Sequence, residues 1–257
     1  MNRLNSQQTG NGPTLVMLHG LFGDLDNFRS IALHMERVLS VTRLDLPGHG
    51  RSAALPEMSH EHVAMAVLEE IGHLGIRDFH LLGHSLGGKV AMSMAGNANC
   101  KGLLSLTVVD IAPKAYPPHH QAIFDALLNL DLETLSDRRE ADTRLRESIP
   151  DAGVRAFLLK SLYRHESERY RWRFDLKQLA NDYPLMSKPP VVSNRIEVPT
   201  LFIKGGKSNY LTPEDEAGIK AICTQPSIQI IPGTGHWPHA EKPAQFTRVC
   251  QEFIGHV

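Results

Sequence analysis

Ser85 is the residue of this chain whose surroundings point most clearly to chemistry. It lies between two glycines in the motif Gly83-His84-Ser85-Leu86-Gly87. An apolar run precedes the motif at residues 79–82, and residues 90–95 follow it with the small and apolar side chains of a packed helix. A serine on so tight a turn between a strand and a helix exposes its hydroxyl, and glycines are needed where a Cβ would strike neighbouring backbone. The pattern predicts a nucleophile elbow with Ser85 as the nucleophile.

A serine hydroxyl is a weak nucleophile at neutral pH, so it needs a base within hydrogen-bond reach and an acid that orients the base. His236 lies in a glycine-rich loop, residues 233–238, after the last predicted strand. Such a loop is free to bring a side chain to the edge of a sheet. His239 is the rival, but its neighbours resemble the start of the closing helix. We expect His236 to be the base.

The acid is less obvious, because the loop at residues 204–210, which follows a predicted strand and could hold an acid at the edge of the sheet, contains no carboxylate. Ser208 takes that place, and a neutral hydroxyl cannot stabilise an imidazolium. Asp110 ends the preceding strand, residues 103–109, at the same edge of a parallel sheet. We therefore predict Asp110 as the acid, with a helix cap or an ion pair as its alternative role. Weaker candidates are Asp45, Asp175, Asp182 and Asp215.

Negative charge develops on the carbonyl oxygen during attack, and backbone N–H groups usually stabilise it. One donor should be the amide of Leu86, directly after the nucleophile. The second should be the amide of Leu21, in the loop that follows the strand at residues 14–18. Three further histidines close to these motifs are expected to hold loops in shape rather than to act in catalysis. They are His19, His49 and His84.

Composition excludes several other classes of protein. Among 257 residues, 27 Lys and Arg balance 28 Asp and Glu, so no basic surface for nucleic acid is expected and a small-molecule partner is favoured. The N-terminus lacks the apolar core of a signal peptide, and no run is long enough to span a bilayer, which predicts a cytoplasmic protein without membrane insertion. Neither the spacing of the cysteines nor that of the paired histidines predicts a disulfide framework, a metal site or a cofactor. These residues are Cys100, Cys223, Cys250, His60, His62, His119 and His120.

The elements that must position these residues alternate between strand and helix. Strands are predicted at residues 14–18, 41–44, 79–82, 103–109, 199–203 and 227–231. Helices between them predict a mostly parallel sheet that is covered on both faces. The alternation stops near Pro113, and residues 114–190 show helical stretches near 120–130, 136–148 and 151–163. We therefore expect one core domain, residues 1–113 and 191–257, with residues 114–190 inserted as a helical cap.

The motifs together resemble the α/β-hydrolase superfamily over almost the full chain. They are His19-Gly20, Asp45-x-Pro47-Gly48-His49-Gly50-x-Ser52, Gly83-x-Ser85-x-Gly87 and Gly235-His236. A finer resemblance is to the YbfF-type bacterial esterases, related to mammalian abhydrolase domain proteins. It rests on residues 19–27, on Val109-Asp110-Ile111-Ala112-Pro113 and on Gly205-Gly206-Lys207-Ser208.

This resemblance implies an α/β-hydrolase fold with the cap inserted after the sixth strand, and the short N-terminus implies that the first one or two strands are reduced or absent. It implies that Asp110 is the acid, and that short acyl esters or acyl-CoA thioesters are hydrolysed without a cofactor. A carbon-carbon bond hydrolase and a cofactor-free haloperoxidase share the same motifs, and a non-catalytic ligand-binding protein on this scaffold is the alternative of another class. Fold alone does not set the substrate. Apolar residues of the cap that could line an acyl pocket, or form the core of the cap, are Phe124, Leu127, Leu128, Phe157, Leu158, Leu162 and Trp172.

Overall fold

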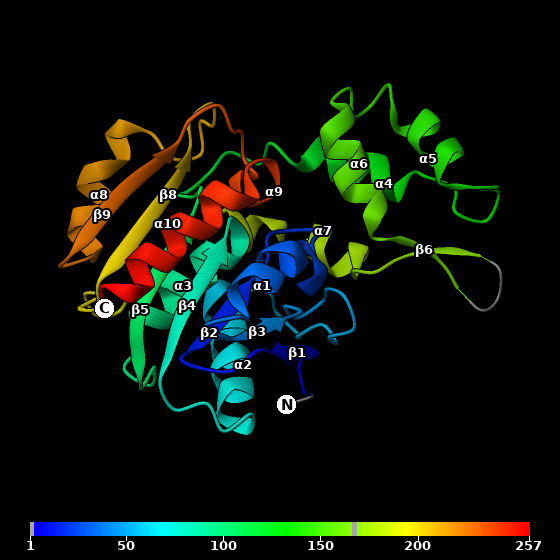
Figure 1. The fold of residues 1–257 in the computed structure, drawn as a ribbon. Coiled ribbons are helices and arrows are strands. Elements are labelled where there is room, and N and C mark those ends of the chain that lie inside the picture. Colours follow the sequence, from blue (N-terminus) through cyan, green and yellow to red (C-terminus); the bar gives the residue numbers. More distant parts are fainter. Residues whose placement is uncertain (1–2, 166–168) are drawn as a thin grey trace.

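A mostly parallel sheet of seven strands forms the centre of the molecule (Figure 1). The computed structural model describes residues 3–165 and 169–257. The strands lie in the order β1-β3-β2-β4-β5-β8-β9, and only β1 runs antiparallel to its neighbour. Their bounds are Ser6–Thr9 for β1, Thr14–Leu18 for β2, Ser40–Leu44 for β3, Phe79–His84 for β4, Leu103–Val109 for β5, Thr200–Gly205 for β8 and Pro226–Ile231 for β9.

Alternating side chains along the strands feed two apolar layers, one on each face of the sheet. In β2, Leu15 and Met17 pack into the layer under helices α1 and α10, whereas Val16 and Leu18 pack into the layer under α2 and α3. Because both faces are buried, the sequence of this strand is continuously apolar rather than alternating. The helices of the core are α1 (Arg29–Met35), α2 (His60–His73), α3 (Leu86–Ala95), α8 (Glu216–Ile222), α9 (Pro238–Glu241) and α10 (Pro243–Gly255), with 3₁₀ turns η1 (Leu25–Phe28) and η2 (Pro213–Asp215).

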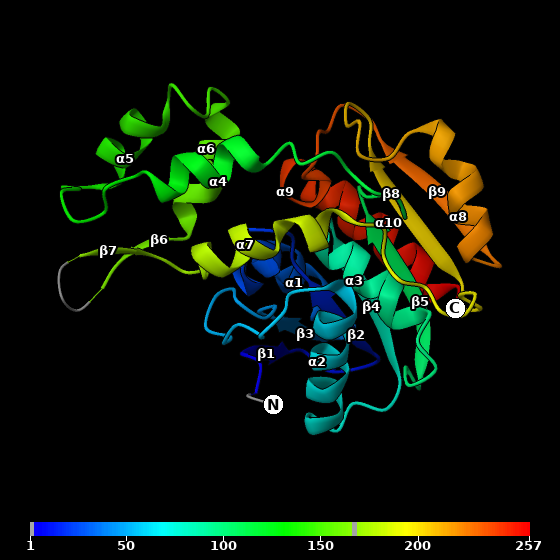
Figure 2. The same cartoon turned by 180° about the vertical axis from the view of Figure 1, so that it is seen from behind.

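A long segment leaves the core after β5 and returns before β8. It contains α4 (Gln121–Leu128), α5 (Arg138–Leu145), α6 (Ala152–Lys160), a hairpin of β6 (Leu162–Arg164) and β7 (Tyr170–Trp172), and α7 (Leu176–Ser187). Seen from behind, α4, α5 and α6 stand away from the sheet, while α7 lies along the core beside α3 (Figure 2). Strand β5, which precedes this segment, is the fifth along the chain among the seven described strands of the sheet.

Three details of the predicted elements are wrong. The helix expected at residues 151–163 ends at Lys160, and the residues after it form the hairpin β6-β7, which was not expected. Helix α7 was missed because Pro184 lies inside it, and proline normally interrupts a helix. Strand β1 was missed because its sequence, Ser-Gln-Gln-Thr, carries no apolar alternation at the edge of the sheet.

Candidate active site

Ser85 lies between the end of β4 and the start of α3 with a strained backbone. Its φ is 52° and its ψ is −116°, a region that non-glycine residues seldom adopt. The chain turns so tightly that a Cβ on Gly83 would come within 2.2 Å of the carbonyl oxygen of Gly87. A Cβ on Gly87 would come within 2.4 Å of the carbonyl oxygen of Leu18. Both glycines are therefore required by the geometry predicted from the motif.

A chain of hydrogen bonds joins Ser85 to His236 and Asp110. His236 Nε2 lies 3.0 Å from Ser85 Oγ, and its Nδ1 lies 2.7 Å from Asp110 Oδ2. Because an ionised carboxylate only accepts, the proton lies on Nδ1 and leaves the Nε2 lone pair facing the serine hydroxyl. The three side chains come from the end of β4, the loop after β9 and the end of β5, which meet at the carboxyl edge of the sheet.

Asp110 is completely buried, and its carboxylate is fully hydrogen-bonded. Oδ1 accepts from the backbone N–H of Gly205 at 2.8 Å, and Oδ2 accepts from the hydroxyl of Ser208 as well as from His236. Ser208 thus lies in the loop where the sequence lacks an acid and donates to the carboxylate supplied by the neighbouring strand. These donors compensate a buried charge that would otherwise be costly.

The rival candidates occupy structural positions. His239 packs against Phe28, His84 and Phe246, its Nδ1 has no hydrogen-bond partner in the described chain, and burial lowers its pKa to about 3. The four weaker carboxylates bond to backbone amides elsewhere. Asp45 accepts from Leu25 and Arg51, Asp175 from Gln178, Asp182 from Met58, and Asp215 from Thr212 as well as from Lys114.

The three histidines expected to shape loops make the contacts that such a role requires. His19 Nε2 accepts from the amide of Leu46 at 3.0 Å, and His49 Nε2 accepts from the amide of Phe22 at 3.3 Å. His84 Nε2 donates to the backbone carbonyl of His236 at 2.8 Å and so holds the loop of the base. Burial lowers the pKa of all three rings, and that of His49 to about 3, which keeps them neutral.

The amides of Leu21 and Leu86 are free to bind an oxyanion. Within residues 3–165 and 169–257, neither N–H donates to a protein acceptor. Leu86 is the first residue of α3, where the helix dipole also favours negative charge. Leu21 follows Gly20, at which a Cβ would come within 2.9 Å of the His84 ring. Both leucines line the same pocket as Ser85.

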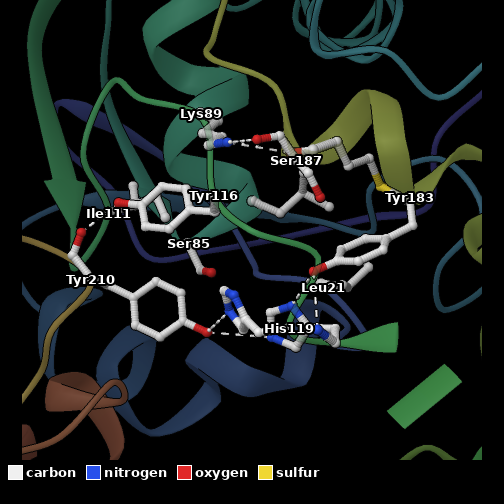
Figure 3. Close-up of a pocket in the computed structure, with 12 residues that line it drawn as sticks. Leu21, Ser85, Lys89, Ile111, Tyr116, His119, Tyr183, Ser187 and Tyr210 are labelled. Atoms are coloured by element: carbon white, nitrogen blue, oxygen red, sulfur yellow. Dashed lines mark hydrogen bonds between the residues drawn. The ribbon is translucent and has the colours of Figure 1, made fainter. Parts of the chain in front are cut away.

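This pocket is narrow, with a cavity volume of about 40 Å³. Figure 3 shows Ser85 in the middle of its lining residues, with the rings of Tyr116, Tyr183 and Tyr210 around it. A larger groove of about 1130 Å³ reaches His236 between α6 and the residues of η1 and α1. The pocket is lined by Leu21, Ser85, Leu86, Lys89, Ile111, Tyr116, His119, His120, Tyr183, Met186, Ser187 and Tyr210.

Most of the cap residues considered for the pocket form the core of the inserted segment instead. Phe124, Leu127, Leu158 and Leu162 are at most 1% exposed and belong to one apolar cluster. Leu128 faces solvent, and Phe157 lines the larger groove beside Trp237. None of the seven residues lines the narrow pocket, to which the inserted segment contributes only α7 and the residues before α4.

Two of the pocket residues that sequence reasoning missed make contacts with the triad or with α7. Tyr210 stacks on the imidazole of His236, and the buried Lys89 donates from Nζ to the carbonyls of Met186, Ser187 and Lys188 at the end of α7. Lys89 lies one helical turn after Ser85, a spacing that places both on one side of α3 and is visible in the sequence. The contact of Tyr210 depends on the loop after β8 and has no sequence signal of its own.

The described residues show neither a metal-ligand cluster nor a membrane-spanning helix. No three side chains of His, Cys, Asp or Glu gather there as ligands for a metal ion. No helix there has the length and apolar character that a bilayer crossing requires. The three cysteines are unpaired.

Comparison with known proteins agrees with the geometry. Residues 15–249 match the model of the Alpha/beta hydrolase family. A putative esterase/lipase of Haemophilus influenzae is 36% identical over 96% of this chain and 85% of its own length, and Esterase YbfF of Escherichia coli is 31% identical over 97% and 96%. A solved structure of a marine microorganism esterase superposes with a TM-score of 0.94 at 34% identity, covering 98% of this chain and 99% of the other. The chain therefore belongs to the α/β-hydrolase family, with the fold that its motifs predict.

Proposed function

We propose that this enzyme is a serine esterase that hydrolyses short-chain acyl esters or acyl-CoA thioesters through an acyl-enzyme. The observation that carries the proposal is the hydrogen-bonded chain from Ser85 through His236 to Asp110, with links of 3.0 and 2.7 Å. Neutral His236 has its lone pair on the serine hydroxyl and its N–H on a buried carboxylate. This is the arrangement that activates a serine.

In the first half-reaction, Ser85 Oγ attacks the acyl carbonyl while its proton passes to His236 Nε2. The amides of Leu21 and Leu86 stabilise the oxyanion, and Asp110 stabilises the imidazolium. His236 then protonates the departing alcohol or thiol, which leaves an acyl group on Ser85. In the second half, His236 removes a proton from water, the resulting hydroxide attacks the acyl-enzyme, and the carboxylic acid is released as Ser85 regains its proton.

The shape of the site favours short acyl groups. The pocket at Ser85 holds about 40 Å³ and its wall is partly apolar, with Leu21, Ile111 and Met186. The groove of about 1130 Å³ reaches His236, the residue that must protonate the leaving group, so we expect the alcohol or thiol part to lie there. We propose that residues 114–190 act as the cap that forms these walls over the core of residues 1–113 and 191–257.

The test is hydrolysis of p-nitrophenyl butyrate by the parent and by Ser85→Ala. We expect the variant to lose at least about a thousandfold in kcat, because removal of a triad nucleophile leaves only binding and the oxyanion amides. A panel of p-nitrophenyl esters, acyl-CoA thioesters and carbon-carbon bonded diketones then defines the substrate. Turnover of diketones without esters would contradict the esterase proposal and favour a carbon-carbon bond hydrolase.

A further inference from the structure

Tyr210 lies face to face with the imidazole of His236. The two ring centroids are 3.8 Å apart and the ring planes differ by 21°. Tyr210 comes from the loop after β8, and its backbone N–H donates to Ser208 Oγ at 3.2 Å. The same hydroxyl of Ser208 donates to Asp110. The acid, the base and the ring of Tyr210 are therefore held by one connected set of contacts.

The far end of Tyr210 is held by the inserted segment. Its hydroxyl lies 2.8 Å from His119 Nε2 and 3.3 Å from His120 Nε2, and His120 Nδ1 lies 2.8 Å from the hydroxyl of Tyr183 in α7 (Figure 3). Burial lowers the pKa of His120 to about 3, so its ring carries one N–H and one lone pair. It must therefore donate to one tyrosine and accept from the other, which the amphoteric hydroxyls allow. The hydroxyl of Tyr116 also donates to the backbone carbonyl of Tyr210.

We propose that Tyr210 is a positioning residue for the base: its ring holds the His236 imidazole in line between Asp110 and Ser85 and stabilises the imidazolium formed during attack. The inference rests on the proposed role of His236 as base. The face of an aromatic ring carries partial negative charge, so a stacked cation is stabilised relative to the neutral ring. The ring also limits rotation of the imidazole away from the serine, together with His84, whose ring centroid is 4.8 Å from that of His236.

The titratable groups around His236 allow a clean measurement of its pKa. The carboxylate is Asp110, and the neighbouring histidines are His84, His120 and His239. Burial lowers the pKa of these three, and the nearby tyrosines Tyr116 and Tyr210 have pKa values raised by burial. These three histidines therefore stay neutral while the His236 ring is titrated.

The experiment is an NMR titration of the His236 imidazole in the full chain and in Tyr210→Leu, together with kcat and KM for p-nitrophenyl butyrate. Leucine keeps the site apolar but removes the aromatic face. Because that face favours the charged form, its loss should lower the pKa of His236 by about half a unit. The same loss should reduce kcat about threefold with little change in KM. The acidic limb of kcat/KM should move to lower pH by the same half unit.

Two further variants separate positioning from general damage. Tyr210→Phe keeps the ring face but loses the bonds to His119 and His120, so it should restore the parental pKa and most of kcat. Tyr163→Leu, on β6 and outside the lining of the pocket, should leave both unchanged. The inference is overturned if folded Tyr210→Leu has the parental pKa, or if Tyr210→Phe loses as much kcat as Tyr210→Leu. The titration needs no turnover, so absence of ester hydrolysis in the parent would count against the proposed function alone.

Discussion

At the scale of single residues, one buried carboxylate accepts hydrogen bonds from several groups of the site. Asp110 accepts from Gly205, Ser208 and His236, and it is completely buried. Ser208 therefore does not replace the acid. Its hydroxyl donates a hydrogen bond to Asp110 instead. The spacing of the motifs predicts Ser85, His236 and Asp110, because each of them follows the end of a strand. It does not predict the stacking of Tyr210, because the contact joins two loops that come together only in the fold.

Asp110→Asn should lose about a thousandfold or more in kcat on p-nitrophenyl butyrate, because an amide can hold His236 in the wrong tautomer and cannot stabilise its charge. Asp215→Asn is the matched control: this carboxylate caps η2 and pairs with Lys114, and it does not line the narrow pocket. The control should keep the parental kcat. Near-parental activity in Asp110→Asn would assign the acid to another carboxylate.

At the scale of elements, the turn between β4 and α3 is set by sterics that a single methyl group tests. Gly87→Ala would bring a Cβ within 2.4 Å of the carbonyl oxygen of Leu18, so we expect a severe loss of soluble, active protein. Gly72→Ala is the matched control, because this glycine lies in α2 with no atom within 4 Å of the added methyl. It should stabilise the protein by about 0.5–1 kcal/mol in urea unfolding. A fully active, stable Gly87→Ala would contradict the close packing of the elbow.

Lys89 links α7 to α3. Its Nζ donates to the carbonyls of Met186, Ser187 and Lys188. The same Nζ lies 4.9 Å from the ring centroid of Tyr116. Lys89→Met leaves buried carbonyls without this donor, which should reduce the free energy of unfolding by about 1–3 kcal/mol. Lys220→Met removes an exposed i,i+4 pair with Glu216 and should cost at most about 0.5 kcal/mol. Urea unfolding of both variants measures the difference, and equal losses would show that Lys89 does not hold α7.

The elements also show where sequence patterns lose information. The buried strands and the helices that cover them were predicted because burial on both faces leaves a continuous apolar run. Strand β1 carries no such run, since it lies at the edge of the sheet. Helix α7 contains Pro184, and its buried face depends on contacts with the core that the local sequence does not contain. Local periodicity therefore predicts the buried strands and the helices α4, α5 and α6, and it misses β1, the hairpin β6-β7 and α7.

At the scale of the whole molecule, buried neutral histidines couple stability to pH. Burial lowers the pKa of His49, His120 and His239 to about 3 and that of His60 to about 4. Their ordinary pKa of about 6.5 returns on unfolding, so below that pH the unfolded chain binds protons that the folded chain does not. The stability that these neutral histidines contribute is therefore fully present above pH 6.5 and is lost as the pH falls toward 4.

We expect the free energy of unfolding to fall between pH 6.5 and 5.5 by about 1 kcal/mol for each such histidine. His239→Leu removes one of them from a site with no hydrogen bond on Nδ1. It should reduce the slope of the unfolding free energy against pH by the equivalent of about one bound proton. Urea unfolding at several pH values gives the slope for both proteins. An unchanged slope in the variant would show that His239 is not a buried neutral group.

Ser85 should be the activated nucleophile of this fold. The most direct measurement is peptide mapping by mass spectrometry after reaction of the full-length protein with a fluorophosphonate, which labels activated serines. We expect one adduct, on Ser85, that forms much more slowly in His236→Ala. No adduct, or an adduct on another serine with Ser85 unmodified, would contradict it.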